Sequence, residues 1–232
     1  METKLAKIAQ IARERPKEQF TSLAHLLNVE MLRECHQELN GNKASGIDEI
    51  TKTQYAGNLT ENLEKLHESL KMMTYKPQAV RRVYIPKPGS SKKRPLGIPS
   101  YEDKIVQLAV SKILTAIYEQ DFISCSYGFR PGRSAHDALR ELNSIIMTRK
   151  TNWVVDADIA GFFDHVDHQW MMRCLEVRIK DSKLLRIIVR MLKAGIMEKG
   201  EFKASPEGTP QGGVVSPILA RYLPALYPGS LV

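Results

Sequence analysis

The chain has 232 residues, 43% of them hydrophobic, which is enough for one large domain or two small ones around a buried core and argues against a disordered protein. Its 34 Lys and Arg exceed its 26 Asp and Glu, and the formal net charge of +8 favours a polyanionic partner such as nucleic acid. Three widely spaced cysteines argue against a disulfide framework or a zinc site. The charged N-terminal segment contains neither a signal peptide nor a membrane span. We therefore expect a cytoplasmic protein without a membrane partner.

The N-terminal region is predicted to be helical. Apolar residues recur at helical spacing over 4–13 and 20–39, and Gly41 falls where the second helix has to stop. A third helical pattern, with leucines on one face over 59–70, ends before Pro77.

A β-hairpin with a basic tip is predicted next. Apolar residues alternate from Val80 to Ile98, and the run Lys87-Pro-Gly-Ser-Ser-Lys-Lys-Arg94 interrupts them. Seven Lys or Arg, counting Lys76, and no acidic residue lie from Lys76 to Tyr101, which favours phosphate contact. The alternative is a solvated strand edge whose charges only discourage aggregation.

Two helices begin with a Ser-x-x-Asp pattern, in which the serine caps the helix. The first starts at Ser100 and is long and amphipathic, and the second starts at Ser134 and closes near Lys150. Just before the second helix, glycines and the two arginines Arg130 and Arg133 occur at an open helix N-terminus, an arrangement typical of phosphate binding. The alternative is an Arg-rich turn that only packs.

Residues 153–159 are predicted to form a strand, with Asp156 and Asp158 on the same face. The sequence continues as Ile-Ala-Gly-Phe-Phe-Asp164, a glycine turn followed by two aromatic residues. Carboxylates at the end of a strand near a basic hairpin suit Mg²⁺, which takes carboxylate oxygens together with substrate phosphates. Taken alone, an acidic residue beside a turn, such as Asp158, is more often a helix cap or a solvated loop residue.

Helices are predicted over 167–178 and 182–194, followed by a short hairpin around Gly200. In the segment Gly208-Thr-Pro-Gln-Gly-Gly-Val-Val-Ser-Pro217, adjacent glycines allow a backbone to approach a planar partner, although a plain β-turn is the alternative. The order of elements predicts an α+β fold, with helices apart from small antiparallel sheets.

Four segments occur in one order: IPKPGSSKKRPLGIP, SYGFRPGRSAHDAL, DADIAGFFDHVDH and EGTPQGGVVSPILA. Together they resemble the successive blocks of group II intron-encoded reverse transcriptases, over residues 40–220. The resemblance implies a right-hand polymerase fold, with fingers and an incomplete palm. It predicts an N-terminal helical extension over 1–40, fingers over 41–150, a partial palm over 151–220 and a divergent tail over 221–232.

The resemblance also assigns roles to residues. Asp158 matches the catalytic carboxylate, and the carbonyl of Ile159 assists it in holding two Mg²⁺ ions. Phe163 matches the aromatic residue that selects deoxynucleotides. The other residues assigned to the nucleotide or its triphosphate are Lys87, Arg94, Gln211 and Gly212. The charge of the hairpin assigns RNA contact to Arg81, Arg82, Lys92 and Lys93. The resemblance places Arg130 and Arg133 near the template strand.

The sequence also departs from the pattern. It contains no Tyr-x-Asp-Asp motif, Ala160 stands where the family carries lysine, and Pro224 and Pro228 interrupt the expected helix near the end. We therefore expect a reverse transcriptase fragment that binds intron RNA and template-primer without turnover, with Mg²⁺ weakly held or absent. Two Mg²⁺ ions and deoxynucleoside triphosphates belong to the intact parent.

Other functions remain open alongside this one. The first is a non-catalytic RNA-binding or splicing-cofactor module, in which the basic surface acts and the aspartates are vestigial. The second is a relative of diversity-generating or CRISPR-associated reverse transcriptases. A homodimer is also left open.

Overall fold

The computed structural model describes residues 2–86, 89, 91, 93–159 and 161–209. The helices of its main body are α1 (Glu2–Glu14), α2 (Val29–Glu38), α3 (Lys52–Ala56), α4 (Leu59–Lys71), α5 (Tyr101–Tyr118), α7 (His168–Glu176) and α8 (Ser182–Leu192). The strands are β1 (Val80–Pro86), β2 (Lys93–Ile98), β3 (Ile196–Glu198) and β4 (Glu201–Lys203). Two 3-10 turns, η1 (Ala24–Leu26) and η2 (Phe162–Asp164), and the helix α6 (Ala135–Thr148) complete the described elements.

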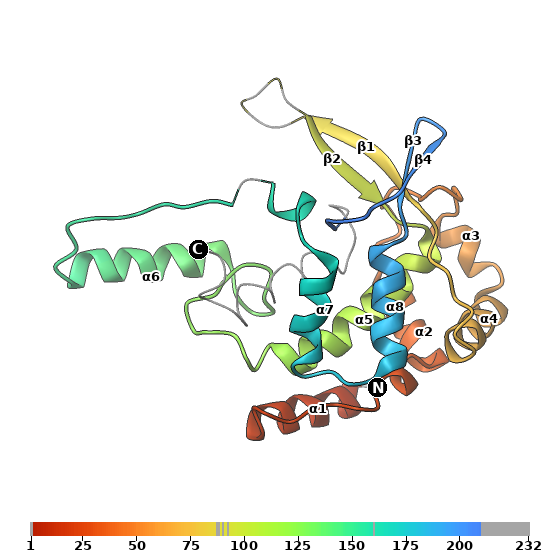
Figure 1. Cartoon of the computed structure of the whole chain (residues 1–232), viewed down its shortest axis with the longest axis horizontal. Coiled ribbons are helices and arrows are strands. Elements are labelled where there is room, and N and C mark those ends of the chain that lie inside the picture. Colours follow the sequence, from red (N-terminus) through yellow and green to blue (C-terminus); the bar gives the residue numbers. More distant parts are fainter. Residues whose placement is uncertain (1, 87–88, 90, 92, 160, 210–232) are drawn as a thin grey trace.

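Helix α5 is the centre of the body. It begins after Ser100, whose hydroxyl accepts a hydrogen bond from the amide of Asp103 at 3.2 Å, and twelve of its eighteen residues are buried. Helices α1 and α2 pack on it, α4 packs on α2, and α7 lies beside α8 (Figure 1). Within the described part of the chain, no helix combines the length and apolarity that crossing a bilayer requires.

The helix predicted over 20–39 is shorter than expected. Only α2 is regular, and the side chain of Asn28 caps it by accepting from the amide of Met31 at 2.9 Å. The preceding amides of Leu23 and Ala24 donate to the carboxylate of Asp181 instead, at 2.5 and 2.7 Å. Because these amides hydrogen-bond to a residue distant in the sequence, the chain here forms η1 rather than a continuous helix.

A buried arginine holds the N-terminal segment to the body. Arg178 is 2% exposed and pairs with Asp121 at 2.5 Å. Its other guanidinium nitrogens donate to the carbonyls of Glu18 and Ala12, at 3.0 and 3.2 Å. An isolated parallel β-bridge between Phe20 and Ile179 joins the same two segments of the chain.

The four strands form one sheet in the order β2-β1-β3-β4. Both predicted hairpins are confirmed, because β1 pairs with β2 and β3 pairs with β4 in antiparallel fashion. The sheets were expected to be purely antiparallel, but Val80 in β1 lies beside Ile196 in β3 in a parallel pairing. The sheet is therefore mixed, and it joins strands from the regions expected as fingers and palm.

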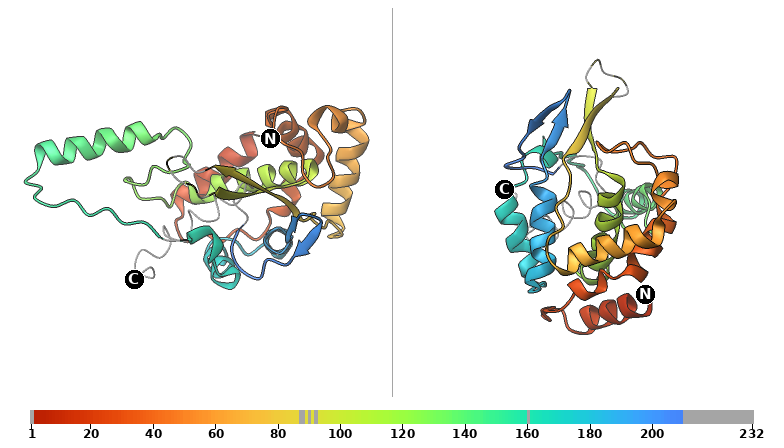
Figure 2. Two further views of the ribbon diagram at one scale, coloured as in Figure 1. Left: turned by 90° about the horizontal axis from the view of Figure 1, so that it is seen from above. Right: turned by 90° about the vertical axis from the view of Figure 1, so that its right-hand side faces the viewer.

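Helix α6 and the segment after it project from the body as an arm (Figures 1 and 2). No residue of α6 is buried. The strand predicted over 153–159 is wrong, because this segment has no regular secondary structure, and Trp153 and Val155 are 88% and 87% exposed. A strand requires a neighbour for its backbone groups, and no strand of the described chain lies beside this segment.

Candidate nucleotide and nucleic-acid interface

Two glycines shape the turn that carries Phe163. Gly161 has a φ of 62°, in the left-handed region, and it precedes η2. Gly208, with a φ of +77°, lies so close to this turn that an added Cβ would be 2.7 Å from the carbonyl oxygen of Asp164. Both the backbone angle and the available space therefore exclude a side chain at position 208.

Hydrogen bonds join this turn to the segment that leads into the Pro-Gln-Gly-Gly motif. The amide of Thr209 donates to the carbonyl of Phe163 at 2.7 Å, and the amide of Gly208 donates to that of Val166 at 2.8 Å. In α7, Nε2 of His168 donates to the carbonyl of Gly208 at 2.7 Å. The two motifs are distant in the sequence, but they meet in the fold.

The side chain of Phe163 is half-buried. Its ring meets the ring of Phe162 edge-on, with 5.6 Å between the centroids. The backbone beneath Phe163 is fixed by the contacts of Gly208 and Thr209, while part of the ring stays open to solvent. An aromatic residue in this setting is held in place and can still contact a ligand.

Asp158 and Ile159 lie in the extended segment before this turn, and both are exposed. Asp156 is exposed as well. Among the described residues, no group of three or more His, Cys, Asp or Glu side chains is arranged to hold a metal ion. Asp158 has the hard oxygen donors that Mg²⁺ prefers, but one carboxylate is not a ligand set for two ions.

The β1–β2 hairpin presents cations on both faces. Arg94 lies opposite Ile85 in the register. Because side chains alternate along a strand, Arg81 and Arg94 share one face, whereas Arg82 and Lys93 share the other. Lys93 and Arg94 are exposed near the tip, and Arg82 is half-buried.

Arg81 contacts the protein itself. Its Nε and one terminal nitrogen both donate to the carbonyl of Ser45, at 3.2 and 2.6 Å. The loop containing Ser45 lies against α5 because Gly46 has no side chain, and a Cβ there would be 2.5 Å from the backbone of Ser100. Lys104 donates to another carbonyl of this loop at 2.5 Å. The roles of Gly46 and Lys104 were not predicted, because such contacts leave no periodic pattern in the sequence.

A buried carboxylate fixes the base of the hairpin to α5. Asp103 accepts hydrogen bonds from the hydroxyl of Tyr75 at 2.5 Å and from the amide of Gln78 at 2.9 Å. Burial raises the pKa of Asp103, and these hydrogen bonds oppose the rise. Beside it, burial together with the charges of Asp103 and Asp48 raises the pKa of Glu102 to about 7.

Arg130 is packed into the loop before α6. Its side chain is 7% exposed, and its Nε pairs with Glu119 at 2.7 Å. One terminal nitrogen donates to the carbonyls of Ile123 and Ser126, at 3.0 and 2.9 Å, and the guanidinium lies 5.0 Å from the ring centre of Phe122. These contacts support the alternative in which the Arg-rich turn packs.

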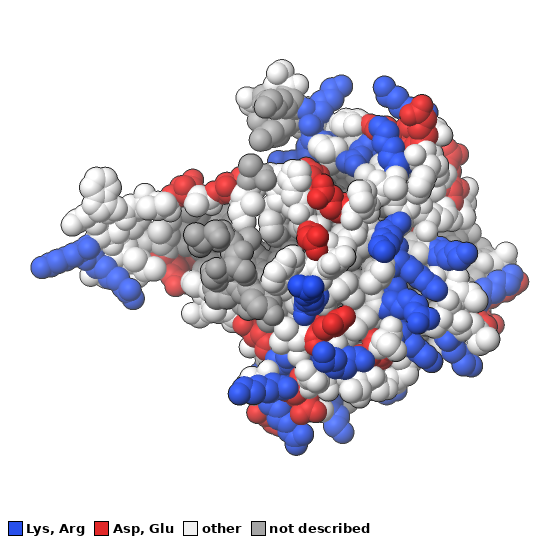
Figure 3. All heavy atoms as spheres, viewed as in Figure 1, with Lys and Arg blue, Asp and Glu red and all other residues white. Residues whose placement is uncertain are grey.

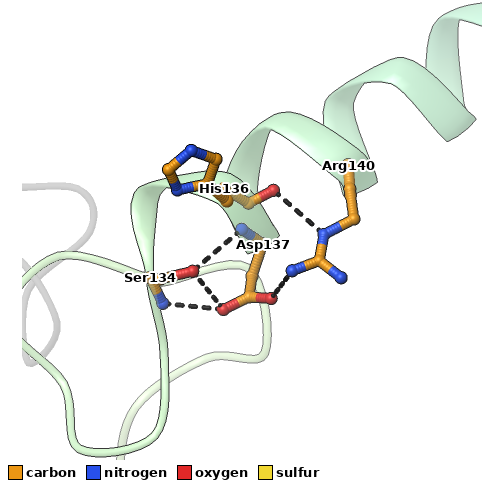
Figure 4. Close-up of polar contacts among 4 residues, drawn as sticks. All are labelled: Ser134, His136, Asp137 and Arg140. Carbon is orange, nitrogen blue, oxygen red and sulfur yellow. Dashed lines mark hydrogen bonds and ion pairs between the residues drawn. The ribbon is translucent and has the colours of Figure 1, made fainter.

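The N-terminus of α6 is closed by its own side chains (Figure 4). The hydroxyl of Ser134 accepts from the amide of Asp137 at 3.2 Å, and the carboxylate of Asp137 accepts from the amide of Ser134 at 2.8 Å and from Arg140 at 2.7 Å. The hydrogen bonds from Ser134 lower the pKa of Asp137. Nearby, Arg133 donates to the carbonyl of Ser124. A phosphate at this helix end would therefore meet a carboxylate.

Several predicted residues lie outside the described residues, so their roles stay predictions. These are Lys87, Lys92, Ala160, Gln211 and Gly212. Of the other predicted residues, the structure brings Phe163 to the start of the Pro-Gln-Gly-Gly segment and places Arg94 on the hairpin.

A comparison with family models identifies the class. The model described as "Reverse transcriptase (RNA-dependent DNA polymerase)" matches residues 85–223, more than half of the chain. This chain belongs to the reverse transcriptase family. The match begins in β1 and includes the turn of Phe163 and the segment that docks on it.

Curated relatives narrow the class further. The group II intron-encoded protein LtrA of Lactococcus lactis subsp. cremoris is 41% identical over 218 residues, which are 94% of this chain and 36% of LtrA. Protein YkfC of Escherichia coli (strain K12) is 40% identical over 187 residues, which are 79% of this chain and 49% of YkfC. The resemblance to group II intron-encoded proteins is confirmed, and the chain spans between about a third and a half of these relatives' lengths.

A solved structure supports the same fold. The "Partial Cas6-RT-Cas1--Cas2 complex" superposes with a TM-score of 0.57 over 89% of this chain and 34% of that one, at 21% identity. At this identity the likeness concerns the fold alone. The expected α+β architecture of fingers with part of a palm is confirmed.

Proposed function

We propose that this chain supplies the template- and nucleotide-binding part of an RNA-directed DNA polymerase. The observation that carries the proposal is the docking of Gly208 and Thr209 on the turn of Phe163, because it unites two motifs of the polymerase family into one surface. The partners in this proposal are intron RNA, template-primer and deoxynucleoside triphosphates, and the location is the cytoplasm. A homodimer is not part of it.

In this proposal Phe163 contacts the sugar of the incoming nucleotide. Its backbone is fixed by Thr209 and its ring packs on Phe162, so the ring cannot retreat easily from a 2′-hydroxyl. Arg94, exposed on the hairpin, contacts the triphosphate together with Lys87, while Gln211 and Gly212 line the nucleotide and template pocket.

The RNA-facing residues follow from the exposure of the cations. Lys93 and Arg94 are exposed, and Arg82 is half-exposed on the other face from Arg94. They bind phosphates in this proposal, together with Lys92. Arg81 and Arg130 act indirectly, because their hydrogen bonds hold the loops on which the surface depends. Arg133 borders the template strand.

The carboxylate of Asp158 suits Mg²⁺, but the described residues do not provide enough further carboxylates around it for two ions. A two-ion site requires several carboxylates, whereas the described residues contain no group of three that suits a metal. We therefore assign Asp158, with the carbonyl of Ile159 beside it, as one part of a metal site that needs further carboxylates. The 232-residue chain alone should hold Mg²⁺ weakly or not at all, and no step of the reaction is assigned to it.

Primer extension on an RNA template tests the proposal. The 232-residue chain should not extend a primer, since its sequence has no Tyr-x-Asp-Asp motif. A chimera in which residues 1–209 replace the matching part of a full-length group II intron-encoded relative should extend the primer. Asp158→Asn should reduce that activity by at least about a thousandfold, and Phe163→Ala should raise ribonucleotide incorporation.

Two outcomes would contradict the proposal. If a folded chimera with Asp158 intact does not extend the primer, this chain does not supply a working part of a polymerase. Extension by the 232-residue chain, abolished by Asp158→Asn, would show that the carboxylates present are sufficient.

A second candidate is an RNA-binding module without polymerase chemistry. It is favoured because the described chain contains no group of three or more His, Cys, Asp or Glu side chains that could hold a metal ion. Both candidates predict RNA binding that weakens steeply with salt and that Lys93→Glu with Arg94→Glu reduces. The chimera separates them, because the second candidate predicts that a folded chimera with Asp158 intact does not extend the primer, whereas the first predicts extension that Asp158→Asn abolishes.

A further inference from the structure

A row of cations runs along one side of α8. Lys183, Arg186, Arg190 and Lys193 follow one another at intervals of three, four and three residues, which places them on one face of a helix. At about 1.5 Å per residue the row is about 15 Å long. We refer to these four residues as the α8 stripe.

Packing fixes the direction of the α8 stripe. The opposite side of the helix is buried in the core through Leu184, Ile187, Ile188, Met191 and Leu192. The helix cannot rotate without exposing these residues, so Lys183, Arg186 and Lys193 are held outward on a rigid support, while the half-buried Arg190 is bound to the protein itself.

The charges of the α8 stripe are not neutralised locally. Residues 182–193 contain no Asp or Glu, and the preceding Asp181 is buried and accepts four backbone hydrogen bonds. Within the described chain, none of Lys183, Arg186 and Lys193 forms an ion pair, and all three are exposed.

Helix α4 shows what an ordinary solvated face looks like in the same protein. Its Lys65 pairs with Glu61 at 2.7 Å, and its Lys71 lies 3.9 Å from Glu68. Alternating signs of this kind satisfy a helix face in water. The α8 stripe has no such acids, so its charge is directed outward.

The α8 stripe is continuous with the hairpin. Arg190 donates to the carbonyls of Met73 and Tyr75, at 2.8 and 2.7 Å, which ties α8 to the chain that enters β1. After α8, the carbonyl of Gly195 accepts from the amide of Val80 in β1 at 3.0 Å. Figure 3, drawn from the same side as Figure 1, shows Lys and Arg gathered over α8 and across toward α4.

We propose that the α8 stripe is a second contact surface for the phosphate backbone of duplex RNA, separate from the hairpin tip. This inference rests on the proposed RNA binding and extends it to a surface that none of the predicted contacts includes. A straight, rigid row of cations suits a stiff duplex, and duplex RNA is recognised through its phosphates and shape rather than its base edges.

The test is filter binding to an RNA duplex of about 16 base pairs across a salt series. The variant Arg186→Gln with Lys193→Gln removes two exposed cations without disturbing the core. Each lost phosphate contact should reduce the salt slope by about 1, so the slope should fall by about 2 and the affinity at 0.1 M salt by about tenfold or more.

The control is Lys65→Gln with Lys71→Gln on α4, which changes the net charge equally. It should leave the slope unchanged, and thermal melting should show both variants folded. An equal loss in the control would mean that binding follows net charge, and an unchanged α8 variant would mean that RNA does not touch the stripe. Either result overturns the inference while leaving the proposed function intact.

Two further arms complete the experiment. If the unmodified chain does not bind RNA at any salt concentration, the proposed function and this inference are both overturned. If the α8 variant loses binding to polyglutamate but keeps RNA binding, the stripe serves an acidic peptide and the assignment to RNA is overturned.

Discussion

Helices α5 and α6 begin with the same device and end in opposite environments. Each starts with a capping serine followed three residues later by aspartate, at Ser100 and Asp103 in α5 and at Ser134 and Asp137 in α6. Twelve residues of α5 are buried, whereas no residue of α6 is. A local capping signal therefore predicts that a helix forms, but not what it packs against.

The aspartates show where the two helices diverge. Asp137 stays within its capping box and also holds Arg140 (Figure 4). The carboxylate of Asp103 instead accepts hydrogen bonds from the hydroxyl of Tyr75 and the amide of Gln78, and these bonds connect α5 to a distant part of the chain. The same residue type serves local order in one helix and tertiary structure in the other.

The apolar residues of the two helices follow the same division. Those of α5 form the centre of the core with α1 and α2. Those of α6 include large side chains that are exposed in the structure, namely Leu139, Leu142, Ile146 and Met147. Amphipathic spacing alone does not distinguish a packed helix from an exposed one.

The largest expected difference between α5 and α6 concerns their apolar side chains. Ile113 in α5 is fully buried, so Ile113→Ala should lower the free energy of unfolding by about 2–5 kcal/mol through lost contacts and a cavity. Leu139 in α6 is 62% exposed, so Leu139→Ala should change it by less than about 0.5 kcal/mol. Urea denaturation measures both.

Equal destabilisation by the two substitutions would contradict this comparison. It would mean that α6 unfolds with the core, and that its exposed leucines are covered in solution. Ile113→Val is the graded control, with an expected loss of about 0.5–1.5 kcal/mol.

A smaller effect sharpens the comparison through pH. Burial, and to a smaller extent the charges of Asp103 and Asp48, raise the pKa of Glu102 to about 7. The folded protein therefore binds a proton at Glu102 more tightly than the unfolded chain does. The free energy of unfolding contributed by Glu102 is therefore fully present below about pH 4.5 and is lost as the pH rises toward 7. Glu102→Gln should stabilise the protein by about 1–2 kcal/mol at pH 8, after allowance for solvent screening.

Denaturation at several pH values between 4 and 8 checks this expectation. The difference between the variant and the unmodified protein should grow with pH and level off above about pH 7. Glu176→Gln, at an exposed position, is the matched control for the loss of one carboxylate. A difference that stays constant with pH would contradict a titration of Glu102 in this range.

Local patterns predicted the elements that local interactions determine. Helical spacing placed α1, α4, α7 and α8 within a few residues of their ends, and alternation with basic or glycine turns placed both hairpins. The ordered motifs also predicted the family. These signals depend on neighbours in the sequence, so a single sequence is sufficient to detect them.

Contacts between distant segments were not predictable in the same way. The parallel pairing of β1 with β3 and the pairing of Arg178 with Asp121 leave no periodic trace in the sequence. The strand over 153–159 had the right alternation but has no partner among the described strands. In the candidate site, the docking of Gly208 on Asp164 was missed for the same reason, although the glycine itself was evident.

The smallest expected effect tests the caps themselves. Ser100→Ala and Ser134→Ala each remove the side-chain acceptor of one N-cap, which typically costs about 1 kcal/mol of helix stability. Since α5 is the centre of the core, the loss of its cap should appear in global unfolding, as a fall in melting temperature of about 2–4 °C. The melting temperature should not change with Ser134→Ala, because α6 is outside the core.

The effect of Ser134→Ala should appear in α6 alone. A helix of fourteen residues without tertiary packing is only marginally stable, so a loss of about 1 kcal/mol should lower the hydrogen-exchange protection of α6 amides about fivefold and leave α5 unaffected. Ser134→Asn, which restores a side-chain acceptor, should recover the protection. If Ser134→Ala instead lowers the melting temperature as much as Ser100→Ala does, then α6 belongs to the cooperative core, and the contrast between the two helices reflects only their exposure in this structure.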